Sequence, residues 1–273
     1  MIHPTAIVAP DVEIGEGVEI GPYAVVEAGV EIGAGSRLHS HAVLLSGARL
    51  GERVTVHSFA VIGGLPQSLH FDPATPTGVA IGDGSVLREG VTVNRATKEG
   101  ASTVLGRECF LMANAHVAHD CVLGDHVVAA NDVMIAGHCE IGDHVFLGGG
   151  CGLHQFLRVG PGVMIGGHAS LSFDVPPYVT VAERNCLFGL NLVGLRRRGV
   201  AREVIRELKA LYRRVFAARN PRQEAARALE EAAYGTEEGR IFLAFFGGGS
   251  RGICRPASAA VSGEEPAADG GGA

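Results

Sequence analysis

Two histidines and an aspartate lie close together near the middle of this 273-residue chain. His116, His119 and Asp120 all fall in the segment 114–121, which reads NAHVAHDC. Near neutral pH an imidazole can take a proton from a hydroxyl group, and a neighbouring carboxylate can orient that imidazole. Together with a backbone N–H that faces the reacting carbonyl, these side chains would suit the transfer of an acyl group to a hydroxyl. The alternative is that these histidines only hydrogen-bond within the fold, and their clustering favours chemistry.

The elements that must position these residues follow from a repeat of six. An aliphatic residue stands at every sixth position over residues 2–62, 81–93 and 105–171. The residue two places earlier is usually small or β-branched, and abundant glycine (40 residues) suits tight corners. A period of six predicts a hexapeptide β-helix, in which short strands alternate with turns and three hexads complete a triangular coil. The aliphatic residue of each hexad is expected to point into the prism.

This geometry stacks residues that are eighteen apart, at about 4.8 Å per coil. His119, Gly137 and Gln155 then share one column. Asp120 and His138 share the next column. We therefore expect two imidazoles, a carboxylate, an amide and a glycine backbone in one small patch.

The organisation of the chain follows from where the repeat breaks. The β-helix is expected over residues 1–190, with loops inserted at about 64–78 and 95–104. Helical periodicity predicts a small C-terminal helical domain over 191–246. Residues 247–273 are rich in Gly, Ala, Pro and Ser, so we expect a disordered tail.

Composition excludes several classes of protein. A net charge of −6 argues against nucleic acid as the main partner. No apolar run approaches the length of a membrane span, and the N-terminus does not read as a signal peptide, so we expect a cytoplasmic protein. Residues 195–222 nevertheless carry ten basic and two acidic residues, which indicates either an acidic docking partner or a solvated helix face.

Four cysteines also follow the repeat. Each stands two places before an aliphatic position, where a small core residue is needed. We therefore expect them to fill the core rather than to bind zinc or form disulfides, and we expect no metal and no cofactor. They are Cys109, Cys121, Cys139 and Cys151.

Several segments, in a fixed order, resemble one family. They are NAHVAHDC (114–121), AGH (136–138), LHQF (153–156), DVPPY (174–178) and GLNLVGLRRRG (189–199). Together with the hexads they resemble acyl-[acyl-carrier-protein]–UDP-N-acetylglucosamine O-acyltransferases, which begin lipid A synthesis. The resemblance covers about residues 1–245. It implies a left-handed β-helix, a homotrimer with sites between neighbouring prisms, and transfer of a 3-hydroxyacyl chain from acyl carrier protein to the glucosamine 3-position of UDP-N-acetylglucosamine.

The resemblance also implies roles for single residues. His119 matches the general base, Asp120 the residue that orients it, and the Gly137 N–H the oxyanion donor. Gly167 matches the position that limits the depth of the acyl chain. Substrate contacts are implied for Gln67, His116, His138, Gln155, Asn191 and Arg198, and carrier-protein docking for Arg196, Arg197, Arg202 and Lys209.

Some positions depart from the family pattern and leave alternatives open. Ser68 and His70 stand where the family usually has Asp and Lys, and residues 182–185 differ as well. An N-acyltransferase acting on a related UDP-amino sugar is therefore one alternative. A γ-type zinc hydratase shares the prism, but its two close histidine ligands are five apart, whereas His116 and His119 are three apart. An inert β-helical scaffold is the third alternative.

Overall fold

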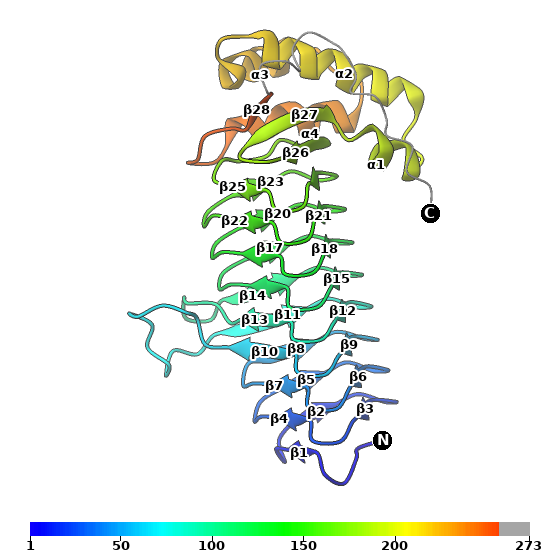
Figure 1. Ribbon diagram of the computed structural model, residues 1–273, viewed down its shortest axis with the longest axis vertical. Helices are drawn as coiled ribbons and strands as arrows, with labels where there is room; N and C mark the ends of the chain where they lie inside the picture. Colours follow the sequence, from blue (N-terminus) through cyan, green and yellow to red (C-terminus); the bar gives the residue numbers. More distant parts are fainter. Residues whose placement is uncertain (257–273) are drawn as a thin grey trace.

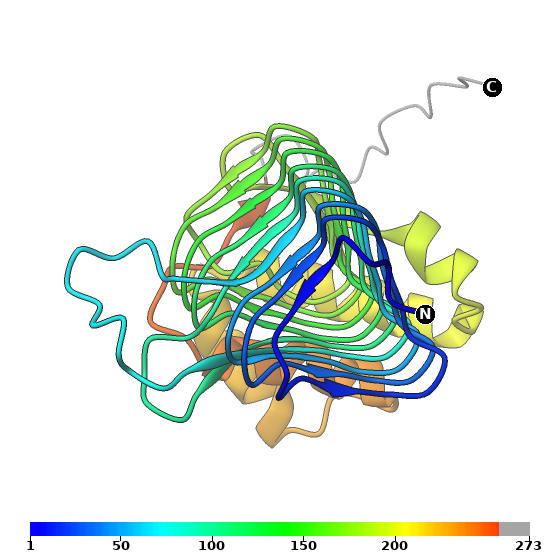
Figure 2. The same ribbon diagram turned by 90° about the horizontal axis from the view of Figure 1, so that it is seen from below.

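The computed structural model describes residues 1–256 and shows a triangular prism closed at one end by helices (Figures 1 and 2). Three sheets form the sides of the prism, and almost all of their strands are parallel. Partner residues in neighbouring coils are eighteen apart along most of the prism, as in the pairing of Val122 with Glu140. The predicted β-helix is confirmed, with one hexad for each strand and turn.

Within residues 1–256, the first face has nine strands and the second face has eight. The first face holds β1 (Ile7–Val8), β4 (Val25–Val26), β7 (Val43–Leu44), β10 (Val61–Gly64), β13 (Thr92–Asn94), β16 (His116–Val117), β19 (Met134–Ile135), β22 (Gly152–Leu153) and β25 (Ser170–Leu171). The second face holds β2 (Glu13–Ile14), β5 (Glu31–Ile32), β8 (Ala48–Leu50), β11 (Gly78–Ile81), β14 (Ser102–Leu105), β17 (Val122–Leu123), β20 (Glu140–Ile141) and β23 (Arg158–Val159).

The third face has eleven strands in the described part of the chain and continues into the end of the prism. It holds β3 (Glu19–Ile20), β6 (Arg37–Leu38), β9 (Thr55–Val56), β12 (Val86–Leu87), β15 (Phe110–Leu111), β18 (Val128–Ala129), β21 (Phe146–Leu147), β24 (Met164–Ile165), β26 (Val179–Ala182), β27 (Cys186–Leu190) and β28 (Arg255–Pro256). We call the edge between the first and second faces the first corner, that between the second and third faces the second corner, and the remaining edge the third corner.

The aliphatic ladder forms the core, as expected. Leu44, Leu111 and Leu147 have no exposed surface, and the small position two places earlier is buried with them. The first coil differs, because Ile2 and Ile14 remain 48% and 38% exposed. Among residues 1–256 no coil lies beneath it to cover these side chains, so they are exposed to solvent.

Corner residues depart from the expectation that glycine supplies the turns. Gly17, Gly29 and Gly35 do adopt positive φ at corners, but many corners use other residues. Asp120 and His138 have φ of 59° and 61° at the second position of their corners. A left-handed conformation costs a residue other than glycine about 1–2 kcal/mol, although Asp, Asn and His tolerate it best. Polar and aromatic side chains are thereby displayed along the edges of the prism.

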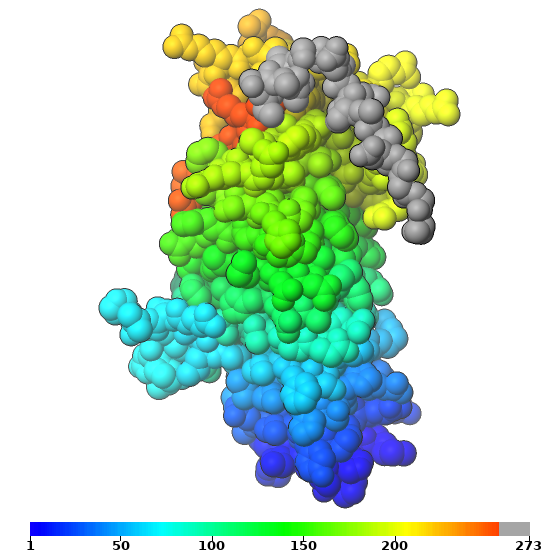
Figure 3. All heavy atoms as spheres, viewed as in Figure 1, coloured from blue at the N-terminus to red at the C-terminus, as the bar shows by residue number. Residues whose placement is uncertain are grey.

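Both insertions leave the prism at the first corner. Residues 65–77 join β10 to β11 and stand out from the side of the molecule, as Figure 3 shows in cyan. Residues 95–101 join β13 to β14. The second insertion is shorter than expected, because residues 102–104 already belong to β14 and pair with β11.

The helical region begins after β27 with α1 (Leu192–Arg197). It continues with α2 (Arg202–Ala217), α3 (Pro221–Glu230), α4 (Glu237–Ala244) and the 3-10 turn η1 (Phe245–Gly247). Side chains cap three helices: Asn191 accepts from Gly194 N, Asn220 from Gln223 N, and Thr236 from Gly239 N. Within residues 1–256, no helix is both long enough and apolar enough to cross a membrane.

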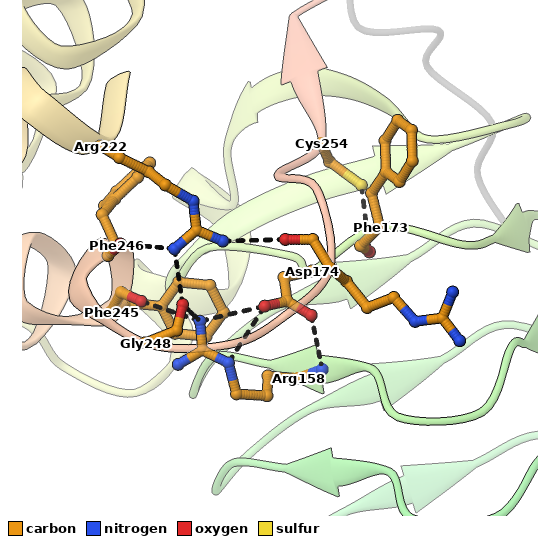
Figure 4. A network of polar contacts seen from close by, with 9 residues as sticks. Arg158, Phe173, Asp174, Arg222, Phe245, Phe246, Gly248 and Cys254 are labelled. Carbon is orange, nitrogen blue, oxygen red and sulfur yellow. Dashed lines mark hydrogen bonds and ion pairs between the residues drawn. The ribbon is translucent and has the colours of Figure 1, made fainter. Parts of the chain in front are cut away.

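The expected disordered tail is wrong for residues 247–256. This stretch packs across the end of the prism, where β28 pairs with β27 and Cys254 is fully buried (Figure 4). Buried Asp174 accepts from Arg158, while its own N–H donates to the Gly252 carbonyl. Composition concealed this, because the stretch is held by backbone pairing and arginine contacts. The remainder of the expected tail, residues 257–273, lies outside the described residues.

Truncation measures the contribution of this segment. A chain ending at Gly249 loses β28, the buried Cys254 and the partner of the Asp174 N–H, whereas a chain ending at Pro256 keeps all three. We expect the shorter chain to melt roughly 5–10 °C below the longer one, since each orphaned buried group costs about 1–3 kcal/mol. Equal melting temperatures in calorimetry would show that the segment contributes no stability.

Candidate active site

The first corner carries the column predicted from the sequence. His119 lies directly beneath Gly137, so that a β-carbon on Gly137 would come within 2.6 Å of His119 Cε1 and 2.9 Å of Nε2. The Phe156 N–H donates to the Gly137 carbonyl at 3.0 Å, which places the Gln155 corner one coil further on. Glycine is therefore needed at position 137 because the imidazole ring occupies the space of a side chain.

His119 and Asp120 form a hydrogen-bonded pair. The Nδ1 atom of His119 lies 2.7 Å from Asp120 Oδ2, and the two side chains are 18% and 13% exposed. A carboxylate only accepts hydrogen bonds, so His119 carries its proton on Nδ1 when it donates to Asp120. Its Nε2 then has a free lone pair. This is the arrangement of a general base held in one tautomer by a carboxylate.

Two threonines that sequence reasoning missed hold Asp120 in place. The Thr97 N–H and hydroxyl donate to the two carboxylate oxygens at 3.0 and 2.7 Å. The Asp120 N–H donates to Thr103 Oγ1 at 2.8 Å. Thr97 belongs to the second insertion, so this loop interrupts the repeat at the place where it secures the carboxylate. No local motif marks either threonine.

These contacts keep Asp120 ionised. Burial raises the pKa of the carboxyl, but hydrogen bonds from Thr97 and His119, together with the nearby His138, outweigh it. The net effect is a pKa below the ordinary value for aspartate.

The other two histidines lie beside this pair. His138 Nε2 is 3.7 Å from Asp120 Oδ2, and its ring stacks on Phe156 with centroids 4.4 Å apart. His116 extends from β16 on the first face, and its Nδ1 lies 2.7 Å from Thr92 Oγ1. Burial, and then the proximity of His119, lowers the pKa of His116. It is therefore mostly neutral at pH 7.

His119, Asp120 and His138 together have the side-chain types of a metal site. One ligand atom from each lies within 4.8 Å of the others. Both Asp120 oxygens, however, already accept hydrogen bonds from Thr97, and Oδ2 also contacts His119. A metal ion would have to displace these bonds, so the arrangement fits a hydrogen-bonded base better than a metal centre.

The mid-chain cysteines fill the core, as predicted. Cys109, Cys121, Cys139 and Cys151 are buried and free. Burial raises the pKa of the Cys109 thiol to about 11 and that of Cys151 to about 12. Both are protonated at neutral pH and cannot serve as nucleophiles.

The remaining expected contacts lie elsewhere on the chain. Gln67 is exposed on the first insertion, which leaves the prism at the first corner. Gly167 lies at the third corner, between β24 and β25. Arg198 lies at the second corner, where its guanidinium fills the space above Gly162, and Asn191 donates to the Gly162 carbonyl at 3.0 Å. One chain thus presents these residues at three different corners.

Two hollows accompany the basic segment. One of about 520 Å³ lies against the third face and is lined by His144, Asn191, Arg197 and Arg198 among others. The other, of about 660 Å³, is lined by Arg196, Arg202, Arg206 and Lys209 around Val200 and Ile205. Arg214 and Arg222 instead bond internally, to Glu224 and Glu231 and to the carbonyls of 246, 248 and 251.

Comparisons with known proteins identify a family that this chain resembles along most of its length. Its residues 174–254 match the family model described as UDP N-acetylglucosamine O-acyltransferase, domain 2, and residues 1–28 match bacterial transferase hexapeptide repeats. It is 49% identical to the acyl-[acyl-carrier-protein]–UDP-N-acetylglucosamine O-acyltransferase of Trichlorobacter lovleyi over 93% of this chain and 99% of that one. The enzyme of the same name from Halorhodospira halophila is 41% identical over the same shares.

The chain belongs to the acyl-[acyl-carrier-protein]–UDP-N-acetylglucosamine O-acyltransferase family.

Solved structures agree with this family. The UDP-N-acetylglucosamine acyltransferase of Campylobacter jejuni superposes with a TM-score of 0.88 at 33% identity, over 94% of this chain and 100% of that one. The Arabidopsis enzyme superposes with a TM-score of 0.80 at 30% identity, over 93% and 100%. Such agreement requires the same hand of coil, so the expected left-handed β-helix is confirmed. The zinc hydratase and the inert scaffold are set aside by family membership.

Histidines give this fold a pH dependence that can be measured. Burial is the main cause that lowers the pKa of His57, His116 and His144 in the folded chain. The unfolded chain therefore binds more protons below about pH 6.5. We expect the free energy of unfolding to be fully retained above that pH and to fall as the pH drops to 5.

Urea titrations at pH 7.5 and 5 test this expectation. The urea concentration at the denaturation midpoint should be lower at pH 5 than at pH 7.5. This decrease should be smaller in His116→Gln, because the variant lacks one of the three histidines. Identical falls in both proteins would show that His116 does not contribute.

Proposed function

We propose that this chain transfers an acyl group from the thioester of acyl carrier protein to the glucosamine 3-hydroxyl of UDP-N-acetylglucosamine. The names of its relatives state this donor and acceptor. The observation that carries the proposal is the His119–Asp120 pair beneath Gly137, which leaves Nε2 of the imidazole as a base at the first corner. The chain's free cysteines suit the reducing cytoplasm, which we propose as its compartment.

In the proposed reaction His119 Nε2 takes the proton as the sugar hydroxyl oxygen attacks the thioester carbonyl carbon. A C–O bond forms, and the carbonyl oxygen becomes an oxyanion. When this intermediate collapses, the C–S bond breaks and the leaving thiolate takes the proton back from His119. Asp120 stays ionised and stabilises the imidazolium between the two steps. A positioned base of this kind contributes roughly 10²–10⁴ to the rate.

The Gly137 N–H is the proposed donor to the oxyanion. Within residues 1–256 it donates to no acceptor, whereas at the second corner the N–H groups of Glu52 and Arg107, at the same place in their hexads, donate to aspartates one coil on. The N–H is therefore available beside the imidazole. One such donor contributes about 3 kcal/mol to transition-state stabilisation.

The separation of the candidate contacts supports a homotrimer. A substrate that touches His119 at the first corner, Arg198 at the second and Gly167 at the third needs residues from neighbouring copies. Leu69 on the first insertion is fully exposed and Leu65 is half exposed, which leaves apolar surface for a neighbour to cover. We propose that Arg198 and Asn191 of one chain bind the nucleotide whose sugar reaches His119 of the next.

Carrier protein is proposed to dock on the basic hollow. Arg196, Arg202 and Lys209 line it together, while Arg197 lines the neighbouring hollow with Arg198. An acidic protein surface complements this charge. Because the two hollows share α1, the docked carrier could deliver its thioester toward the nucleotide side of the site.

The base assignment predicts a specific loss. His119→Ala removes the only group proposed to take the proton, so kcat should fall at least 100-fold with the fold and assembly retained. His116→Ala should instead raise KM for the sugar nucleotide, because His116 is proposed to bind rather than to catalyse. Steady-state kinetics with a carrier-protein thioester provide the measurement. Near-normal kcat in His119→Ala would refute the assignment.

The acyl-chain limit predicts a change of preference. A β-carbon on Gly167 would meet only the Gly149 carbonyl oxygen, at 3.4 Å, and the neighbouring His168 ring lies against Gly150 in its own column. A methionine can therefore be accommodated at 167, with its side chain beside the proposed acyl slot. Each methylene kept out of the slot forfeits about 0.8 kcal/mol.

We expect the native enzyme to prefer long 3-hydroxyacyl chains, and Gly167→Met to prefer clearly shorter ones. Competition between carrier proteins loaded with short and long chains measures this preference. An unchanged preference in the variant would place the chain-length limit elsewhere.

A further inference from the structure

Two backbone hydrogen bonds of the same kind link successive coils at the first corner. In each bond, the N–H of the second residue of a turn donates to the carbonyl of the first residue of the turn one coil earlier. His138 N donates to His119 O at 3.0 Å, and Phe156 N donates to Gly137 O at 3.0 Å. Continuing the series, the Gln155 carbonyl would accept from the N–H of residue 174.

The series stops at Gln155 because the coil changes course. The Asp174 N–H donates to Gly252 O at 2.7 Å instead, and Asp174 forms a bridge with Ile253. In place of a backbone N–H, Nη2 of Arg251 donates to Gln155 O at 3.1 Å. A side chain from the C-terminal segment therefore supplies the bond that a further coil would have made.

The same guanidinium nitrogen also contacts His154. Nη2 of Arg251 lies 3.2 Å from His154 Nδ1. His154 Nδ1 also lies 3.3 Å from the Gln155 carbonyl oxygen. An arginine side chain can only donate and a carbonyl can only accept, so the contact with Arg251 needs a lone pair on Nδ1, whereas the contact with Gln155 needs a proton there. The two contacts favour opposite tautomers, and the guanidinium of Arg251 is the one that favours Nε2–H.

The backbone around Arg251 is anchored by hydrogen bonds from two arginines. Its carbonyl accepts from Nη2 of Arg222 on α3 at 2.8 Å, while Nη1 of Arg222 donates to the Gly248 carbonyl at 2.6 Å (Figure 4). Arg158 also donates to the Gly248 carbonyl, at 2.7 Å. A β-carbon on Gly249 would collide with Asp174, so the chain passes there without a side chain. The backbone that carries Arg251 is fixed to both the helices and the prism.

We propose that Arg251 is a positioning residue, which closes the active-site column by fixing the Gln155 carbonyl and the tautomer of His154. The inference rests on the proposed function, because the family resemblance implies that Gln155 contacts the substrate of that reaction. The C-terminal segment is then a working part of the site, although it lies far from His119 in sequence. The segment holds the Gln155 corner in position by supplying the hydrogen-bond donor that a further coil would otherwise have supplied.

Arg251→Ala tests the proposal, with Arg255→Ala as the matched control. Arg255 is an exposed residue of the same segment and makes no side-chain hydrogen bond among the described residues. Arg251→Ala should lower kcat/KM by about 10- to 100-fold, since small misplacements of contact groups have effects of that size. Arg251→Lys should recover part of the activity, and so should millimolar methylguanidinium added to Arg251→Ala. The control should retain its activity.

Imidazole ¹⁵N NMR without substrate separates this proposal from the proposed function. The His154 ring should show the Nε2–H tautomer in the native chain and in the control, and a mixture in Arg251→Ala. An unchanged ring spectrum would overturn the contact, even if the native chain proved inactive with carrier thioesters. A changed spectrum with unchanged kcat/KM would overturn the role of Arg251 in turnover. A loss of activity in proportion to a loss of folded protein would overturn it as well.

Discussion

Backbone hydrogen bonding between coils is the constraint on which the rest of this structure depends. Each coil repeats the previous one after eighteen residues, and over the described residues the exceptions lie at the two insertions and at the capped end. The sequence number of a residue in the prism therefore largely determines where that residue lies in space. His119 comes to lie under Gly137 because the two are one coil apart, and the absence of a side chain at 137 gives the imidazole its room.

This regularity explains why much of the molecule could be predicted. The ladder of aliphatic residues identified the prism and its core, and column arithmetic placed His119, Gly137, Asp120 and His138 together. The cysteines were correctly assigned to the core for the same reason. A period of six leaves one side chain of each hexad pointing inward, so its role is decided by its place in the repeat.

The features that sequence reasoning missed all depend on contacts that no period encodes. Thr97 lies in an insertion, and its link to Asp120 spans 23 residues outside the register of the coil. The segment 247–256 has the composition of a disordered tail, yet it is held by Arg158, Arg222 and Asp174 from distant parts of the chain. Arginines in the basic segment looked alike in the sequence, but Arg214 and Arg222 bond internally while Arg196 and Arg202 line a hollow.

The two ends of the prism are unlike, and this has a consequence for how such a chain can vary. At the helical end, side chains form hydrogen bonds and ion pairs with one particular coil. Adding or removing a coil there would break these contacts. At the other end Ile2 and Ile14 are simply uncovered. A coil of eighteen residues could be gained or lost at that end while every site residue keeps its place relative to the cap. The length of the prism and the chemistry at its first corner can therefore evolve independently.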